Sequence, residues 1–236
     1  AEMPALERWV LHRLAEIDIR IRKMTENYDF HGIFTELHTL CNSDLSAFYF
    51  EIRKDRLYCD AADSVERRAC RTVMHEVFSR LTAWLAPILC FTAEEAWQSW
   101  VGDAEQSVHL RSYDAVPSAW HDMDTAARWD GIRRARQVVT TALEAARNDG
   151  AIGASLQAAP TVHVSPAIAA MFEGEDAAAL FITSAATVTT DAAPGDAFRI
   201  EGIDDVAVVF ATADGGKCAR CWKITPEVTS EDGICN

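Results

Sequence analysis

Apolar residues in the first part of the chain recur at steps of three and four, and this period constrains the fold more than any other feature. A helix turns once every 3.6 residues, so this spacing gathers apolar side chains on one face. The first such stripe comprises Leu6, Trp9, Val10, Leu14, Ile17, Ile21 and Met24. Similar stripes predict helices over residues 30–49, 66–88 and 125–148, with a short helix near residues 92–100. We therefore expect a mainly α protein with a helical bundle over residues 1–150.

The character of the sequence changes after residue 150. Residues 151–213 are rich in alanine, and Arg199 is the sole basic residue among them. Short β-branched runs predict strands at residues 161–164, 186–190, 198–200 and 206–210. Short apolar runs between them predict helices at residues 166–172 and 176–182. We expect a small α+β unit over residues 151–213, followed by a tail over residues 214–236.

The tail contains a closely spaced cysteine pair, Cys218 and Cys221, and a third cysteine, Cys235. Structural zinc takes four soft ligands in a tetrahedron, and a C-x2-C loop is the usual way to present two of them. Glycines at positions 215, 216 and 233 permit the tight turns that such loops need. The sequence thus predicts a partial zinc ribbon with ligands Cys218, Cys221 and Cys235, and a fourth ligand expected beyond residue 236. A redox pair or idle thiols are the alternatives.

Charge limits how the chain can bind nucleic acid. Lys and Arg number 22 against 36 Asp and Glu, a net charge of −14, so contact with RNA must use local patches. Two groups combine cations with an aromatic ring, and we expect both to lie off the regular helices. These candidate tRNA-binding residues are Arg53, Lys54, Arg56 and Tyr58, and Lys217, Arg220, Trp222 and Lys223. A ring among cations suits an unpaired base, although Trp222 could equally pack the tail onto the α+β unit. Other clusters, such as Arg67, Arg68 and Arg71, are typical of solvated helix faces.

Cysteine usage and hydropathy indicate the compartment. Seven cysteines, an odd number, without a secretory signal argue against a disulfide framework and for a cytoplasmic protein. The longest uncharged run, residues 150–172, is interrupted by glycine and proline, so we expect no membrane span. Because the chain opens on Ala1 without an initiator methionine, we expect it to be a piece of a longer polypeptide.

Several segments, in order along nearly the whole chain, resemble the helical anticodon-binding domain and zinc tail of bacterial isoleucyl-tRNA synthetases, which are class I enzymes. The resemblance lies in residues 45–58, 67–70, 85–97, 144–158 and 217–222. It implies a partner, the tRNA for isoleucine, and a parent ligase that uses ATP. It also implies catalytic and editing domains N-terminal to this region. The signature motifs of those domains are absent from residues 1–236, so we expect no catalytic residues and no activity from this chain alone.

Other functions stay open on the sequence. The stretch at residues 85–97 is shared with valyl and leucyl relatives, so a valyl- or leucyl-type anticodon domain is the first alternative. A non-enzymatic zinc-containing nucleic-acid-binding module is the second. A repair glycosylase would need a catalytic N-terminal residue and a helix-two-turn-helix, neither of which we find. A pure interaction scaffold is the last alternative. We expect a monomer.

Overall fold

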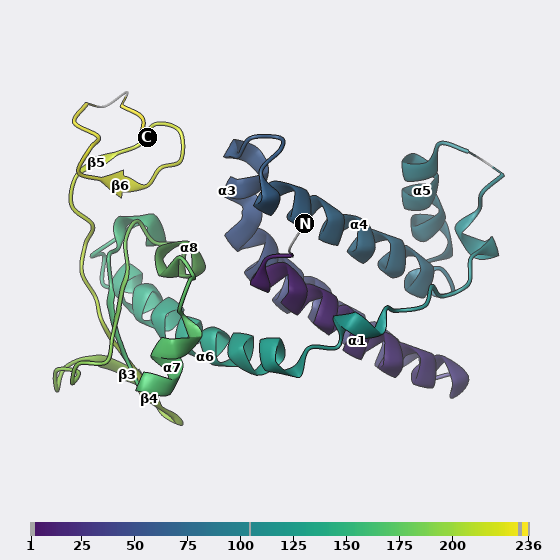
Figure 1. Ribbon diagram of the computed structural model, residues 1–236, viewed down its shortest axis with the longest axis horizontal. Helices are drawn as coiled ribbons and strands as arrows, with labels where there is room; N and C mark the ends of the chain where they lie inside the picture. Colours follow the sequence, from purple (N-terminus) through teal and green to yellow (C-terminus); the bar gives the residue numbers. More distant parts are fainter. Residues whose placement is uncertain (1–2, 104, 231–232, 236) are drawn as a thin grey trace. The chain divides into compact units, whose positions relative to one another are not determined.

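Long helices fill the first part of the chain, as the apolar period predicts (Figure 1). The computed structural model describes residues 3–103, 105–230 and 233–235. Contacts divide the chain into two units, Ala1–Ala126 and Ala127–Asn236. This division falls inside the helix expected at residues 125–148. The three-domain organisation with boundaries at residues 150 and 213 stays a prediction.

The first unit is built from helices and short turns. Its α-helices are α1 (Ala5–Glu26), α2 (Phe30–Thr39), α3 (Glu51–Cys59), α4 (Val65–Leu85) and α5 (Cys90–Val101). Two 3₁₀ turns follow, η2 (Val108–Leu110) and η3 (Ser118–Trp120). Between α2 and α3 the chain forms a π-helix, η1 (Leu40–Phe50). Apolar steps of three and four do not distinguish this wider helix from an α-helix, so the single α-helix predicted for residues 30–49 was wrong in its second half.

The apolar stripe of α1 forms the centre of this unit. Leu14 and Ile17 are fully buried, and Trp9 packs edge-on against Phe48 with ring centroids 5.2 Å apart. Trp84 of α4 is 1% exposed, as its place in the predicted stripe requires. Burial of such aromatic and aliphatic side chains is the main favourable term in folding. The first unit therefore has a core of its own.

A second prediction for this unit was wrong: the basic segment does not leave the helix. Arg53, Lys54, Arg56 and Tyr58 all lie within α3. The segment contains no glycine or proline, and Arg, Lys and Leu favour helix. Ile52, which is 6% exposed, also fixes the start of α3 in the core. A run of charges is therefore compatible with a helix that buries only one narrow side.

The second unit combines one long helix with a small mixed sheet. Its helices are α6 (Met123–Asn148), which crosses the boundary, α7 (Pro166–Met171) and α8 (Ala177–Phe181), with a 3₁₀ turn, η4 (Ser155–Gln157). The strands are β1 (Thr161–Val164), β2 (Thr187–Thr189), β3 (Phe198–Ile200) and β4 (Ile203–Val209), in the order β2-β1-β4-β3. β1 pairs in parallel with β2 and antiparallel with β4, and β3 pairs antiparallel with β4. The predicted strands and helices are confirmed, and the fold class is mainly α.

Two arginines of α6 connect this helix to the short helices. Arg128 donates hydrogen bonds to the carbonyls of Met171 and Glu173, each at 2.7 Å. Arg136 donates to the carbonyl of Leu180 at 2.9 Å. These acceptors lie at or near the C-terminal ends of α7 and α8, where carbonyls lack helical partners and attract cations.

The tail then adds a two-stranded ribbon, β5 (Gly216–Lys217) paired antiparallel with β6 (Ile224–Thr225). Across the described ranges, none of the helices combines the length and apolar character that a membrane crossing requires.

Candidate functional site

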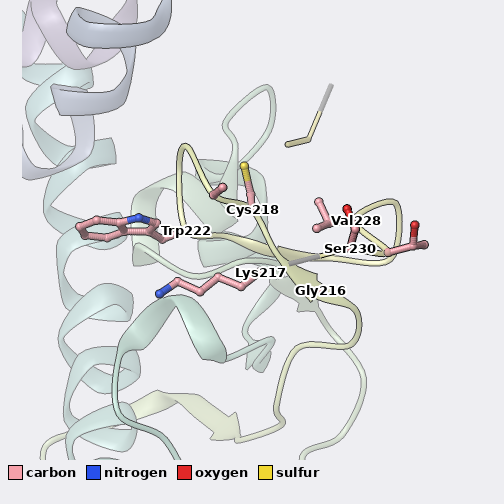
Figure 2. Close-up of a pocket in the computed structure, with 8 residues that line it drawn as sticks. Gly216, Lys217, Cys218, Trp222, Val228 and Ser230 are labelled. Atoms are coloured by element: carbon pink, nitrogen blue, oxygen red, sulfur yellow. The ribbon is translucent and has the colours of Figure 1, made fainter. Parts of the chain in front are cut away.

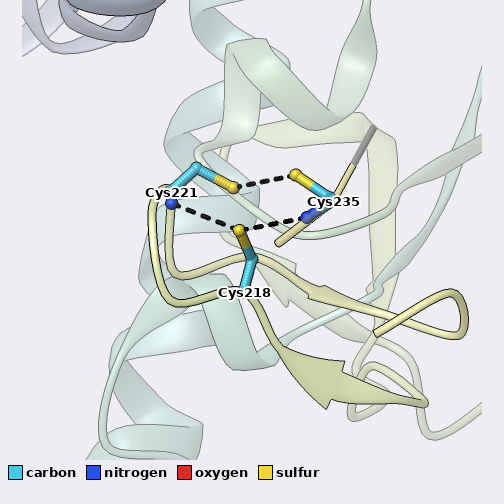
Figure 3. A group of neighbouring side chains, drawn as sticks. All are labelled: Cys218, Cys221 and Cys235. Atoms are coloured by element: carbon cyan, nitrogen blue, oxygen red, sulfur yellow. Dashed lines mark hydrogen bonds between the residues drawn. The ribbon is translucent and has the colours of Figure 1, made fainter. Parts of the chain in front are cut away.

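Three thiols converge in the tail (Figure 3). The sulfur atoms of Cys218, Cys221 and Cys235 all lie within 4.8 Å of one another, and the Cys221 and Cys235 sulfurs are 3.4 Å apart. A disulfide would hold the two sulfurs at about 2.05 Å, so these are separate thiols. Cys218 is buried and the other two are half-buried. The spacing in sequence thus becomes a single cluster of soft donors.

The ribbon strands and the loop between them place these thiols. The backbone N–H of Cys218 donates to the carbonyl of Lys223 at 2.8 Å, and that of Trp222 donates to the carbonyl of Cys218 at 3.0 Å. Ala219 N–H bonds to the carbonyl of Gly233 at 2.9 Å, which draws the segment of Cys235 against the loop. A Cβ on residue 216 would lie 2.2 Å from the backbone oxygen of Val228. Glycine is therefore required there for this close approach.

Backbone amides surround the Cys218 sulfur. The N–H groups of Cys221 and Cys235 point to it at 3.5 and 3.4 Å (Figure 3), and the N–H of Arg220 does so at 3.4 Å. The hydrogen bonds from Cys221 and Cys235 lower the pKa of the Cys218 thiol to about 6. By contrast, burial raises the pKa of the Cys221 thiol to about 11. Backbone N–H groups that stabilise a thiolate favour the ionised form of the cysteine, which is the form that binds a metal cation.

The cluster has the dimensions of a metal site. Zinc–sulfur bonds of about 2.3 Å in a tetrahedron put neighbouring sulfurs about 3.8 Å apart, which is compatible with the 3.4 Å between Cys221 and Cys235 and with the 4.8 Å limit on the other pairs. Cys218, Cys221 and Cys235 can therefore hold a metal ion. Three thiolates leave one position of a tetrahedron for a further ligand.

A cation and an aromatic ring, Lys217 and Trp222, line a hollow beside Cys218 (Figure 2). Trp222 is 62% exposed, and the ammonium of Lys217 lies 5.4 Å from the centre of its ring. Figure 2 shows both side chains directed to the same side of the tail, away from Val228 and Ser230. Trp222 has a positive φ of 66°, a conformation that non-glycine residues rarely adopt. The turn after Cys221 therefore fixes where this ring is presented.

The other two tail cations have different surroundings. Arg220 is exposed and its guanidinium donates to the carbonyl of Cys235 at 3.4 Å. Lys223 is half-buried, and its carbonyl accepts the hydrogen bond from Cys218. The ammonium of Lys217 and the guanidinium of Arg220 are thus the cations most open to a ligand at the tail.

The α3 group divides into an inner and an outer part. Arg53 is only 14% exposed in its side chain and donates two hydrogen bonds, at 2.7 and 2.8 Å, to the carboxylate of Glu7. That carboxylate is fully buried and also accepts from the hydroxyl of Tyr49 at 3.1 Å. Burial is also the main cause that raises the pKa of Tyr49. Arg53 therefore neutralises a buried charge in the first unit.

Lys54, Arg56 and Tyr58 form the outer part of the α3 group. All three are exposed, and Tyr58 is 84% exposed. Arg56 has a weak partner, since its guanidinium lies 3.6 Å from a carboxylate oxygen of Asp60. A long ion pair whose cation is 47% exposed leaves that cation available to a stronger anion. This group belongs to the first unit and the tail group to the second.

The sequence pattern missed two features that the structure shows. Glu7 lies in the α1 stripe beside Leu6, three residues before Val10, and a lone acid in such a stripe is the signal that could have predicted its burial. A series of ring contacts between α4 and α5 was missed as well. His75 and Phe78 contact Trp100 at 5.4 and 5.7 Å between centroids. No local spacing reveals that contact, because the two helices meet only in the folded unit.

Comparison with known proteins gives consistent results. Residues 7–163 match the family model described as the anticodon-binding domain of tRNA ligase. The chain is 49% identical over 238 residues to the isoleucine–tRNA ligase of Ruegeria pomeroyi, and 47% identical over 232 residues to that of Agrobacterium fabrum. These alignments cover 100% and 98% of this chain and 24% of each relative, so the chain spans about a quarter of their length. The chain thus belongs to the family of anticodon-binding domains of tRNA ligases.

Proposed function

We propose that this chain is the anticodon-recognition part of an isoleucine–tRNA ligase and that it binds the tRNA for isoleucine. The observation that carries the proposal is the alignment of the whole chain with ligases named for isoleucine. The rest of such a ligase would supply the reaction that joins isoleucine to its tRNA with ATP. We further propose that the protein acts as a monomer in the cytoplasm.

The proposed RNA contacts come from both units. Exposed cations and rings support roles for Lys54, Arg56 and Tyr58 on α3, and for Lys217, Arg220 and Trp222 in the tail. Arg53 and Lys223 were predicted with them, and their burial makes them weaker candidates. Guanidinium and ammonium groups neutralise phosphates, and exposed rings stack on unpaired bases.

We propose that zinc is the metal of the tail. Zinc bound to Cys218, Cys221 and Cys235 would cross-link the β5–β6 ribbon to the segment of Cys235 and so fix the position of Trp222. Support comes from the all-thiol donor set, the sulfur separations and the amides around the Cys218 sulfur. The fourth ligand is proposed to come from the polypeptide beyond residue 236.

The zinc proposal is tested by elemental analysis of a chain extended by the residues that follow in its parent. We expect about one zinc per chain, as for a single four-ligand site, and loss of that zinc in Cys218→Ser. Cys59→Ser is the matched control, because Cys59 is an exposed thiol on α3 outside the cluster. An extended chain without zinc, with Cys218 and Cys221 freely alkylated under native conditions, would contradict the proposal.

The RNA proposal is tested with transcripts of the tRNAs for isoleucine and for valine. We expect the chain to bind the isoleucine transcript more tightly, and to show no isoleucine-dependent exchange of pyrophosphate with ATP. Arg56→Gln and Lys217→Gln should each weaken binding and lower its salt dependence by nearly one unit per lost phosphate contact. Lys23→Gln, on the last turn of α1, is the control. Tighter binding of the valine transcript would favour the valyl-type alternative.

A further inference from the structure

A groove of about 630 Å³ lies between α4 and α5, outside the groups discussed so far. The side chains that line it are Arg68, Arg71, Thr72, Met74, His75, Phe78 and Trp100. All but Trp100 come from α4, at spacings that put them along one side of that helix. Trp100 stands near the end of α5 and forms the other wall. The groove lies entirely within the first unit.

Aromatic rings form the groove's inner wall and continue into the unit. Trp100 is 58% exposed, and it contacts His75 and Phe78. Phe78 in turn stacks on Trp97 with an interplanar angle of 12° and centroids 6.4 Å apart. The guanidinium of Arg111 lies 4.1 Å from the centre of the Trp97 ring. The indole N–H of Trp97 also donates to the carbonyl of Gln106 at 2.8 Å. Trp97 is therefore held by these three partners, whereas Trp100 presents over half of its surface to solvent.

The outer rim of the groove is cationic. Arg68 and Arg71 are exposed, and neither forms an ion pair within the part of the chain that the structure describes. Other cations nearby have partners: Arg67 donates to the carbonyl of Asp60, and Arg80 pairs with Glu76. Among the residues that the structure describes, none of those lining the groove is acidic. In a protein of net charge −14, a hollow with two free guanidinium groups and no carboxylate is complementary to an anion.

We propose that this groove is a further RNA contact, in which an unpaired base of the tRNA stacks on Trp100 while its phosphates pair with Arg68 and Arg71. The inference rests on the proposed function, because it adds a contact surface for the same RNA. An exposed ring suits the face of a base, and the planar fork of arginine suits a phosphate. A purely apolar partner would leave both guanidinium groups without an anion, which is costly for charges removed from water.

The experiment measures binding of the isoleucine tRNA transcript to the whole chain over a series of salt concentrations. Trp100→Ala should weaken binding about fivefold or more, the usual effect of removing one stacked base contact. Arg68→Gln and Arg71→Gln should each lower the salt dependence by about 0.7 unit, as for a phosphate of a single strand. Trp100→Phe keeps a ring and should retain most of the affinity.

Two matched controls lie outside the groove. Phe91→Ala removes another exposed ring of α5, 91% exposed, and Lys23→Gln removes another exposed cation of the first unit. Both should bind within about twofold of the original chain, since neither lines the groove. Circular dichroism identifies any variant that fails to fold. If Trp100→Ala fails to fold, the variants of the exposed Arg68 and Arg71 still test whether the groove contacts RNA.

The outcomes separate the two proposals. RNA binding that is unchanged in Trp100→Ala and in the double variant Arg68→Gln, Arg71→Gln would overturn the groove as an RNA contact. Failure of the original chain itself to bind the transcript would overturn the proposed function and this inference together. Weaker RNA binding that is confined to the groove variants, with the two controls unchanged, supports both the proposed function and the groove as an RNA contact.

Discussion

The helical bundle of the first unit and the cysteine tail differ in how much apolar surface they bury. In the bundle, Leu14 and Ile17 are fully buried, and Trp9 and Trp84 are each 1% exposed. In the tail, over the described residues 214–230 and 233–235, only Cys218 and Val228 are buried. The bundle has long helices that surround an apolar centre. The tail has two strands of two residues each. Isolated two-stranded hairpins are marginal in water even when longer than this. The difference teaches that the bundle is stabilised by apolar burial, while the tail needs a cross-link, and its thiol cluster supplies the donors for one.

The largest expected effect is on the bundle core. Trp84→Ala should lower the free energy of unfolding of the first unit by about 3–5 kcal/mol, as for other large buried aromatics. The reason is the loss of its apolar burial and the cavity that remains among the α4 stripe. Urea unfolding followed by circular dichroism measures the change. A loss below about 1 kcal/mol would mean that the apolar centre is not what stabilises the bundle.

The second effect concerns the buried ion pair between Arg53 of α3 and Glu7 of α1. Arg53→Ala should cost about 3 kcal/mol, because it leaves the fully buried carboxylate of Glu7 without its partner. Arg56→Ala, three residues along the same helix and 47% exposed, should cost less than about 1 kcal/mol. The double variant Glu7→Gln, Arg53→Met should recover part of the loss. Equal small losses for Arg53 and Arg56 would place both arginines at the surface and return Arg53 to the RNA-binding group.

A smaller effect is expected where the first unit ends. The carboxylate of Asp122 accepts hydrogen bonds from the hydroxyl of Thr125 at 2.6 Å and from its N–H at 2.9 Å, and so caps the start of α6. These bonds hold the pKa of Asp122 below its usual value. Asp122→Ala should therefore cost about 1 kcal/mol at neutral pH.

The pH dependence of that loss follows from the sign of the shift. A carboxylate whose pKa is lowered by folding stabilises the protein above its unfolded pKa, about 3.9, and the contribution disappears as the pH falls through the folded value. The difference between the original chain and Asp122→Ala should thus shrink below about pH 4. Asp130→Ala, at an exposed position of α6, serves as the control and should show little change. A loss that stays constant down to the lowest pH at which the chain folds would contradict the role of the charge.

The smallest stability effect is expected at the tail ring. Trp222 is 62% exposed, so Trp222→Ala should change the unfolding of the bundle by less than about 0.5 kcal/mol. The same variant should weaken binding of the isoleucine tRNA transcript, since it removes a stacking surface. Together with Trp84→Ala it compares two tryptophans of the same chain. A change of more than about 1 kcal/mol in the free energy of unfolding would mean that Trp222 packs against the rest of the protein instead.

Local patterns predicted most of the regular structure. The stripe of α1 and the β-branched runs at residues 161–164 and 198–200 became the elements expected, since periods of 3.6 and 2 follow directly from backbone geometry. The pair Cys218 and Cys221 was predicted to meet Cys235, and the three sulfurs do converge. Where local signals failed, the cause was a contact between elements. The charged run of α3 stays helical because Ile52 is buried and Arg53 reaches Glu7, which is 46 residues away in sequence.

The sequence by itself determined the fold class, the order of elements and the residues able to bind a soft metal ion. These follow from residue type and from spacing along the chain, which act over a few turns or strands. Only the tertiary structure decided which charges are buried and which are open to a ligand. Arg53, Arg56 and Arg71 look alike in sequence, yet one neutralises Glu7, one has a long ion pair with Asp60 and one borders a groove beside Trp100. The physical reason is that the state of a charge depends on its distance from other groups and from water, and packing between distant segments sets both.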